Sequence, residues 1–71
     1  MEIFSPLRIE MDQEEDGRWV ASVPELPGVM AYGDSKEEAT RKAKSVALTI
    51  LADMIDGGEE LPPSLAHLFA A

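Results

Sequence analysis

The residues of this chain that are best suited to catalysis or metal binding are clustered carboxylates. They are Glu10, Asp12, Glu14, Glu15 and Asp16. Carboxylates at such spacing can bind a hard cation or share a proton in acid–base catalysis. A calcium-binding loop, however, needs an alternating series of ligands with a central glycine and a distal glutamate, which this segment lacks. We therefore interpret it as a solvated loop, whose charge also suits it to guide a basic partner toward the protein.

The other side chain that could do chemistry is His67, the only histidine in the chain. A catalytic triad needs three residues held by rigid structure, and Ser64 with His67 near the end of the chain does not supply that. The sequence contains no cysteine, so thiolate zinc sites are excluded, and one histidine does not make a histidine-rich site. We expect no catalytic residue, no metal and no cofactor.

The charge balance favours a protein partner over a nucleic acid. Fourteen acidic residues against six basic ones give a net charge of −8. Proteins bind nucleic acids by neutralising phosphates with lysine and arginine, so an acidic chain is repelled, whereas a basic protein attracts it. We find no signal-peptide pattern and no apolar run long enough to cross a bilayer, which predicts a cytoplasmic protein.

Alternating apolar and polar residues predict an antiparallel sheet. Residues 3–11 and 18–23 alternate with the period of half-buried strands, and the polar segment 12–17 between them predicts a hairpin. Two prolines make residues 24–28 a rigid elbow, because proline lacks the amide donor of a central strand. Residues 29–32, which are short, β-branched and aromatic, predict a third strand.

One long helix is predicted to follow. Ser35 and Glu38 have the spacing of a capping box, and apolar residues then recur at helical spacing as far as Asp56, before Gly57 and Gly58. The sequence therefore predicts a helix over residues 36–56. The expected fold class is α+β: a two-layer β-β-β-α domain over residues 1–58, in which this helix packs on the antiparallel sheet.

The helix carries more apolar side chains than one sheet face can cover. The additional ones extend along one side of the helix and into the tail, residues 59–71. They are Leu48, Ala52, Ile55, Leu65, Leu68 and Phe69. Chains of 71 residues bury little surface and often gain stability by association. Either the tail folds over its own domain, or these residues form the interface of a homo-oligomer, a dimer or a tetramer. Both alternatives remain open.

Two motifs in the chain resemble those of the HicB-like antitoxin family. The segment Gly17-Arg18-Trp19-Val20-Ala21, leading to Pro24-Glu25-Leu26-Pro27-Gly28, is similar to the family's Gly-aromatic-Val-Ala strand and Pro-acidic-Leu-Pro-Gly elbow. The segment Gly33-Asp34-Ser35, followed by Glu37-Glu38-Ala39, is similar to the family's helix start, Gly-Asp-Ser/Thr-x-Glu-Glu-Ala. The resemblance extends over roughly residues 3–56.

The resemblance implies a partial RNase H-like fold and a non-enzymatic role, the silencing of a HicA-type toxin. Such a toxin is a basic ribonuclease that cleaves mRNA, and an acidic protein suits it electrostatically. The implied mechanism is occlusion of the toxin's RNA-binding face. The resemblance does not assign the contacts in this chain; we expect them at Glu14, Glu15 and Asp16 in the loop, and at Glu25 and Leu26 in the elbow.

Two further expectations concern what the chain does not do and what else it could be. Many relatives carry a C-terminal DNA-binding domain, for which the thirteen residues after Gly58 are too few, so we expect no direct DNA binding. The alternative function is a stand-alone oligomeric module that binds a small ligand or another protein at its subunit interface. A metal-dependent nuclease would need more carboxylates at fixed positions than Glu10 and Asp12 supply.

Overall fold

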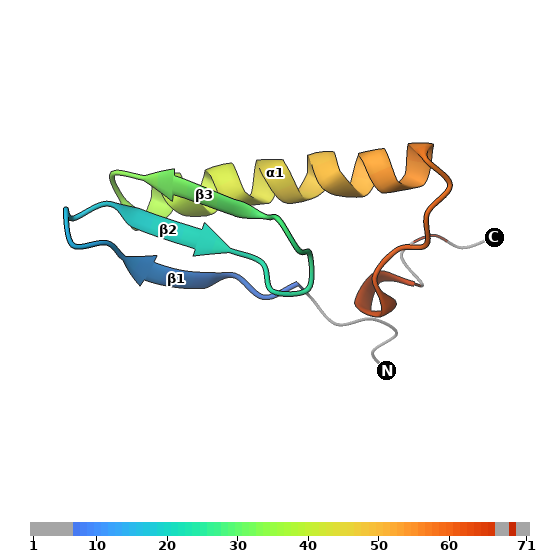
Figure 1. Ribbon diagram of the computed structural model, residues 1–71, viewed down its shortest axis with the longest axis horizontal. Helices are drawn as coiled ribbons and strands as arrows, with labels where there is room; N and C mark the ends of the chain where they lie inside the picture. The colour runs from blue at the N-terminus through green and yellow to red at the C-terminus, as the bar shows by residue number, and fades with distance from the viewer. Residues whose placement is uncertain (1–6, 67–68, 70–71) are drawn as a thin grey trace.

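Three short antiparallel strands and one long helix form the protein in a computed structural model, which describes residues 7–66 and 69 (Figure 1). The elements are β1 (Glu10–Gln13), β2 (Trp19–Ser22), β3 (Met30–Gly33), α1 (Lys36–Asp56) and a 3-10 helix, η1 (Pro63–Leu65). The strand order in the sheet is β1-β2-β3, and each neighbouring pair is antiparallel. The predicted α+β class and β-β-β-α order are confirmed, and α1 has the predicted bounds.

Within the described residues, the first strand begins later than the predicted range of residues 3–11. Strand β1 begins at Glu10, and the backbone N–H of Arg8 donates to the Glu25 carboxylate (3.3 Å) rather than to a strand. At its other end β1 continues to Gln13, into the segment predicted as a loop, because Gln13 lies opposite Trp19. Residues 3–6 of the predicted strand lie outside the described residues.

The start of α1 has the predicted capping box. The Ser35 hydroxyl accepts a hydrogen bond from the Glu38 backbone N–H (3.0 Å), and the Glu38 carboxylate accepts one from the Asp34 N–H (2.6 Å). The first bond satisfies a backbone donor that the first turn of a helix leaves free, and the second ties Glu38 to the residue before the N-cap. The Asp34 N–H donates to the charged form of the Glu38 carboxylate, and Lys42 lies nearby, so the pKa of Glu38 is lowered.

Small side chains make the contact between helix and sheet. Ala39, Ala43 and Ala47 repeat every four residues along α1, and all three are buried beneath it. Their size lets the helix approach β2 and β3, on which it packs, more closely than a leucine ridge would allow. The buried core comprises Ala21, Val23, Leu26, Val29, Ala31, Ala39, Ala43, Ala47, Leu51 and Leu65.

The elbow between β2 and β3 belongs to this core. The Leu26 N–H donates to the Val23 carbonyl (2.9 Å), and the Val29 N–H donates to the Leu26 carbonyl (3.1 Å). The Leu26 side chain is 2% exposed and is the largest fully buried side chain among the described residues. The two prolines therefore frame a tight, hydrogen-bonded turn that inserts a leucine under the helix.

Candidate functional site

The acidic turn between β1 and β2, residues 14–18, is fixed by its own hydrogen bonds. The Glu14 N–H donates to the Arg18 carbonyl (2.7 Å), and the Gly17 N–H donates to the Glu14 carbonyl (2.9 Å). Gly17 has φ +92°, a conformation that glycine adopts without strain. The turn thus presents its carboxylates at one end of the sheet.

The three carboxylates expected to contact a partner in this turn have different surroundings. Asp16 accepts hydrogen bonds from the Arg18 N–H (3.0 Å) and from Arg18 Nε (2.9 Å), and the first of these is the main reason that its pKa is lowered. Glu14 and Glu15 are exposed and, within residues 7–66, make no ion pair. Of the three, these two are therefore the ones free to pair with a basic partner.

Arg18 links the acidic turn to the exposed face of the sheet. While its Nε contacts Asp16, its guanidinium carbon lies 4.8 Å from the centre of the Tyr32 ring, within the range of a cation–π contact. Asp16 therefore positions Arg18 over Tyr32. The sequence does not reveal this arrangement, because it depends on the register that places β3 beside β2.

The face of the sheet that points away from α1 carries two cross-strand rows of side chains. By the strand register, Asp12, Val20 and Tyr32 form one row, and Glu10, Ser22 and Met30 form the other. The rows are acidic at the β1 edge and apolar at the β3 edge, where Met30 is 57% and Tyr32 is 40% exposed. Tyrosine, methionine and arginine are enriched at protein interfaces, so this face has the composition of one.

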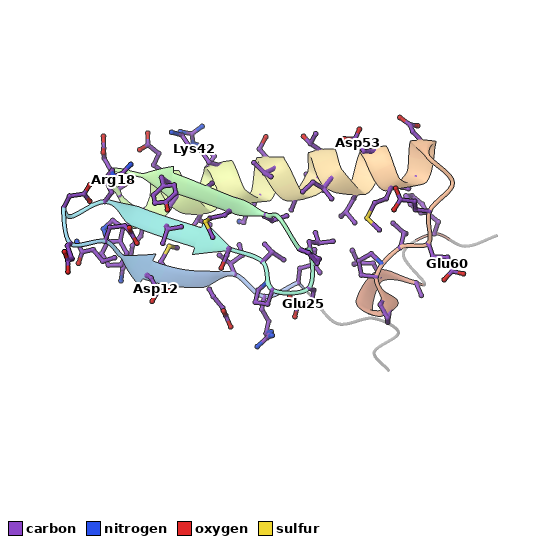
Figure 2. The ribbon with its side chains drawn as sticks, viewed as in Figure 1. Asp12, Arg18, Glu25, Lys42, Asp53 and Glu60 are labelled. Carbon is purple, nitrogen blue, oxygen red and sulfur yellow. The ribbon has the colours of Figure 1, made fainter. Side chains whose placement is uncertain are left out.

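The elbow places Glu25 at the opposite end of the sheet from the acidic turn (Figure 2). Its carboxylate accepts a hydrogen bond from Arg8 Nε (2.9 Å), and Arg8 also lies near Glu10 (3.8 Å). The hydrogen bond from Arg8 lowers the pKa of Glu25, and the same bond raises the pKa of Arg8. Leu26, expected to contact a partner, lies in the core and is 2% exposed.

Among the residues expected at an oligomer interface, some are exposed and one is buried. Leu48, Ile55 and Phe69 are 67%, 48% and 69% exposed, and Ala52 is exposed with them. Leu65 is 6% exposed and packs in the core of its own chain, which it reaches through η1. Leu68 lies outside the described residues, as does His67.

An apolar groove lies between α1 and the segment that leads into β1. Because α1 packs on β2 and β3, it leaves this side of the sheet partly uncovered. The groove has a volume of about 290 Å³. Its lining residues are Leu7, Ile9, Val23, Lys44, Ala47, Leu48 and Leu51.

The part of the chain that the structure describes contains neither a cluster of potential metal ligands nor a helix that could span a membrane. There, no group of three or more histidine, cysteine, aspartate or glutamate side chains could hold a metal ion. Glu10 and Asp12 share the open sheet face without a third such ligand. None of the helices described is long and apolar enough to cross a membrane.

The fold and these surfaces define a class: an acidic two-layer domain whose exposed features suit contact with other proteins. A family profile described as "HicB_like antitoxin of bacterial toxin-antitoxin system" matches residues 6–69. The chain belongs to this family of HicB-like antitoxins. The members of this family are described as antitoxins of bacterial toxin-antitoxin systems.

The chain is also similar to a phage protein. Over 54 residues, which cover 76% of this chain, it is 37% identical to an uncharacterized 14.9 kDa protein from the rep-hol intergenic region of Haemophilus phage HP1. The aligned segment covers 40% of the phage protein, so the chain spans less than half of that relative's length. No solved structure gave a significant match.

Proposed function

We propose that this chain neutralises a HicA-type toxin, a small basic ribonuclease that cleaves mRNA, by covering the toxin's RNA-binding face. Its membership of the HicB-like antitoxin family carries the proposal. The charges of the two proteins support it, because a surface built to hold RNA attracts an acidic protein. The chain would act in the cytoplasm, where mRNA is found, and the described residues would touch protein rather than nucleic acid.

The proposed contact surface is the open sheet face together with the acidic turn. Glu14 and Glu15 supply free charge at one end, and Glu25 lies at the other. Between them, Tyr32 is an exposed aromatic side chain already held by Arg18. Charges at the rim of an interface mainly raise the association rate, whereas aromatic side chains at its centre contribute most of the affinity.

A growth and cleavage assay tests this function. A basic open reading frame of similar size beside the gene for this chain would be expressed alone and together with the chain. We expect growth arrest alone, recovery on co-expression, and loss of RNA cleavage by the purified toxin when the chain is added in equimolar amount. Unchanged cleavage at saturating concentrations of the chain would refute the proposal.

Charge reversal then tests the surface. The double variant Glu14→Lys/Glu15→Lys should slow association with the toxin by roughly tenfold or more at low salt, because steering of this kind spans about 10–10³-fold. The matched control, Glu37→Lys/Asp56→Lys, changes the net charge equally at exposed positions on α1. Stopped-flow rates that fall equally for both double variants would show that net charge alone, and not the acidic turn, guides association.

The alternative, a stand-alone oligomeric module that binds a small ligand or another protein, is favoured by one observation. Leu48 is exposed and lines the 290 Å³ apolar groove, which a second copy of the chain could cover, and Ile55 is exposed further along the same helix. We also propose homo-oligomerisation, as a dimer or tetramer, for the antitoxin itself. Failure of any toxin to bind an oligomer that persists in solution would favour the alternative.

A further inference from the structure

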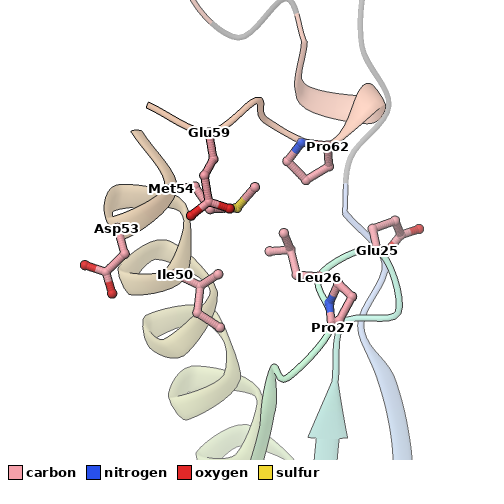
Figure 3. A pocket seen from close by; sticks show the side chains of 8 residues that line it. All are labelled: Glu25, Leu26, Pro27, Ile50, Asp53, Met54, Glu59 and Pro62. Atoms are coloured by element: carbon pink, nitrogen blue, oxygen red, sulfur yellow. The ribbon is translucent and has the colours of Figure 1, made fainter. Parts of the chain in front are cut away.

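A second pocket, separate from the open sheet face and the acidic turn, lies where three segments meet. The elbow, the last turns of α1 and the segment leading to η1 enclose a pocket of about 390 Å³ (Figure 3). Its apolar lining residues are Leu26, Pro27, Ile50, Met54 and Pro62, and its acidic ones are Glu25, Asp53 and Glu59.

Backbone hydrogen bonds hold the walls of this pocket in place. The Glu59 N–H donates to the Met54 carbonyl (2.9 Å), so the chain turns back across the helix end immediately after α1. On the opposite wall, the bonds on either side of Leu26 fix the elbow. The Leu65 N–H donates to the Pro62 carbonyl (2.8 Å), and the Leu65 side chain anchors this segment in the core. The pocket is therefore formed before any ligand binds.

The acidic side chains of the pocket stand at its rim. In Figure 3 the Glu59 carboxylate lies beside the Met54 side chain, whereas those of Asp53 and Glu25 point outward. Glu25 is paired with Arg8, but the structure shows no cation paired with Asp53 or Glu59 among residues 7–66. The floor between them is apolar.

The end of α1 adds to this negative charge. A helix carries partial negative charge at its C-terminus, which favours lysine, arginine or histidine in the last turn. The last turn of α1 has no basic residue, and instead contains Asp53 and Asp56. These carboxylates are at the end of the helix that disfavours them, so local stability does not explain their presence.

We propose that this pocket receives a lysine or arginine side chain from a basic protein partner. Such a side chain combines an aliphatic stem, which the apolar floor would cover, with a cationic head, which the rim and the helix end would attract. A purely apolar side chain would leave the rim unpaired, and an acidic one would be repelled. The proposal rests on the proposed function only in that a basic partner presents this side chain, and it adds a second point of contact beyond the acidic turn.

The test uses a short peptide, and so needs no toxin. The full chain, labelled with ¹⁵N, is titrated to about 10 mM with acetyl-Gly-Arg-Gly-amide, and separately with the same peptide carrying citrulline, the uncharged analogue of arginine. We expect the arginine peptide to shift the amide signals of Leu26, Ile50, Met54 and Glu59, and the citrulline peptide to bind more weakly.

Two variants distinguish binding in the pocket from attraction of the peptide by the overall negative charge of the protein. Asp53→Asn/Glu59→Gln should weaken binding of the arginine peptide, by about two- to fivefold for each exposed charge pair lost. Glu37→Gln removes an exposed carboxylate from the first turn of α1, at the other end of the helix, where it does not line the pocket, and it should leave binding nearly unchanged. Thermal unfolding of each variant checks that the fold is retained.

Three results would overturn the proposal: equal binding of the arginine and citrulline peptides, shifts confined to the acidic turn, or equal weakening by the pocket and control variants. None of these would bear on the antitoxin function, which the cleavage assay measures independently. Conversely, a chain that inhibits no toxin could still bind the arginine peptide in this pocket, so the two proposals fail separately.

Discussion

Replacement of Gly33 by alanine should destabilise the protein more than the same replacement at Gly17. Gly33 is buried at the end of β3, beneath the first turn of α1. A Cβ atom added there would lie 2.5 Å from the Ala39 backbone nitrogen and 2.9 Å from the Glu38 Cβ. Both distances fall well below the 3.4 Å at which ordinary contact begins.

The size of the expected loss of stability depends on which atoms the added Cβ would clash with. The nearest is a backbone nitrogen inside a capped helix, so relief requires movement of β3 or of the helix start by about 0.9 Å. Overpacking of this kind typically costs about 1–3 kcal/mol, and we expect the upper part of that range because flexible side chains cannot absorb the clash. At about 4–8 °C for each kcal/mol, a loss of about 2–3 kcal/mol should lower the melting temperature by about 8–24 °C.

Thermal unfolding followed by circular dichroism measures this effect, with Gly17→Ala as the control. Gly17 has open space around an added Cβ, but its φ of +92° strains an alanine there. That strain should cost about 1–2 kcal/mol. A melting temperature for Gly33→Ala equal to or above that of Gly17→Ala would refute the close packing of β3 on α1.

Three other changes should have smaller, specific effects. Ser35→Ala removes the cap of α1 and should cost about 1 kcal/mol in thermal unfolding, whereas Ser35→Asp should retain most of the stability. Because the pKa of Glu38 is lowered in the folded state, its contribution is present at neutral pH and lost as the pH falls below the ordinary value of 4.5. As the pH falls, the melting temperature of the Glu38→Gln variant should therefore decline less steeply than that of the unmodified protein. Equal slopes of melting temperature against pH would contradict this. Leu48→Glu should shift sedimentation toward the 7.7 kDa monomer if the groove is an oligomer interface, while Thr49→Glu, on the exposed side of α1, should not.

Local signals in the sequence were enough to predict the helix and the order of elements. The bounds of α1 depend on the Ser35–Glu38 capping box at one end and on Gly57 and Gly58 at the other, all within a few residues of the boundary they set. The inward face of β2 follows from its alternation, and Ala21 and Val23 are indeed buried. These features need no knowledge of distant contacts.

Features that depend on distant residues were not predictable in this way. The burial of Leu26 requires the elbow to fold under α1, although its charged and proline neighbours suggest an exposed loop. The pairing of Glu25 with Arg8 joins residues separated by 17 positions, and Arg8 lies before the start of β1, in the range that alternation predicts as strand. The part that Asp16 plays in positioning Arg18 was hidden for the same reason, since Arg18 reaches Tyr32 only through the register of β2 and β3.

The distribution of charge explains how so acidic a chain can concentrate its negative charge at particular places on its surface. Within residues 7–66, three of the six lysine and arginine side chains are paired with acids: Arg8 with Glu25, Arg18 with Asp16, and Lys42 with Glu38.

Because these pairs neutralise acids that shape the fold, the excess charge falls on carboxylates at the acidic turn and at the C-terminal end of α1. Figure 2 shows Lys42 on the first half of α1, and Asp53 and Glu60 toward its end and beyond it. The helix therefore has a charge gradient along its length. A basic partner that contacts both the turn and the second pocket would be oriented by that gradient, so the two proposed contacts would act together to set its direction on the domain.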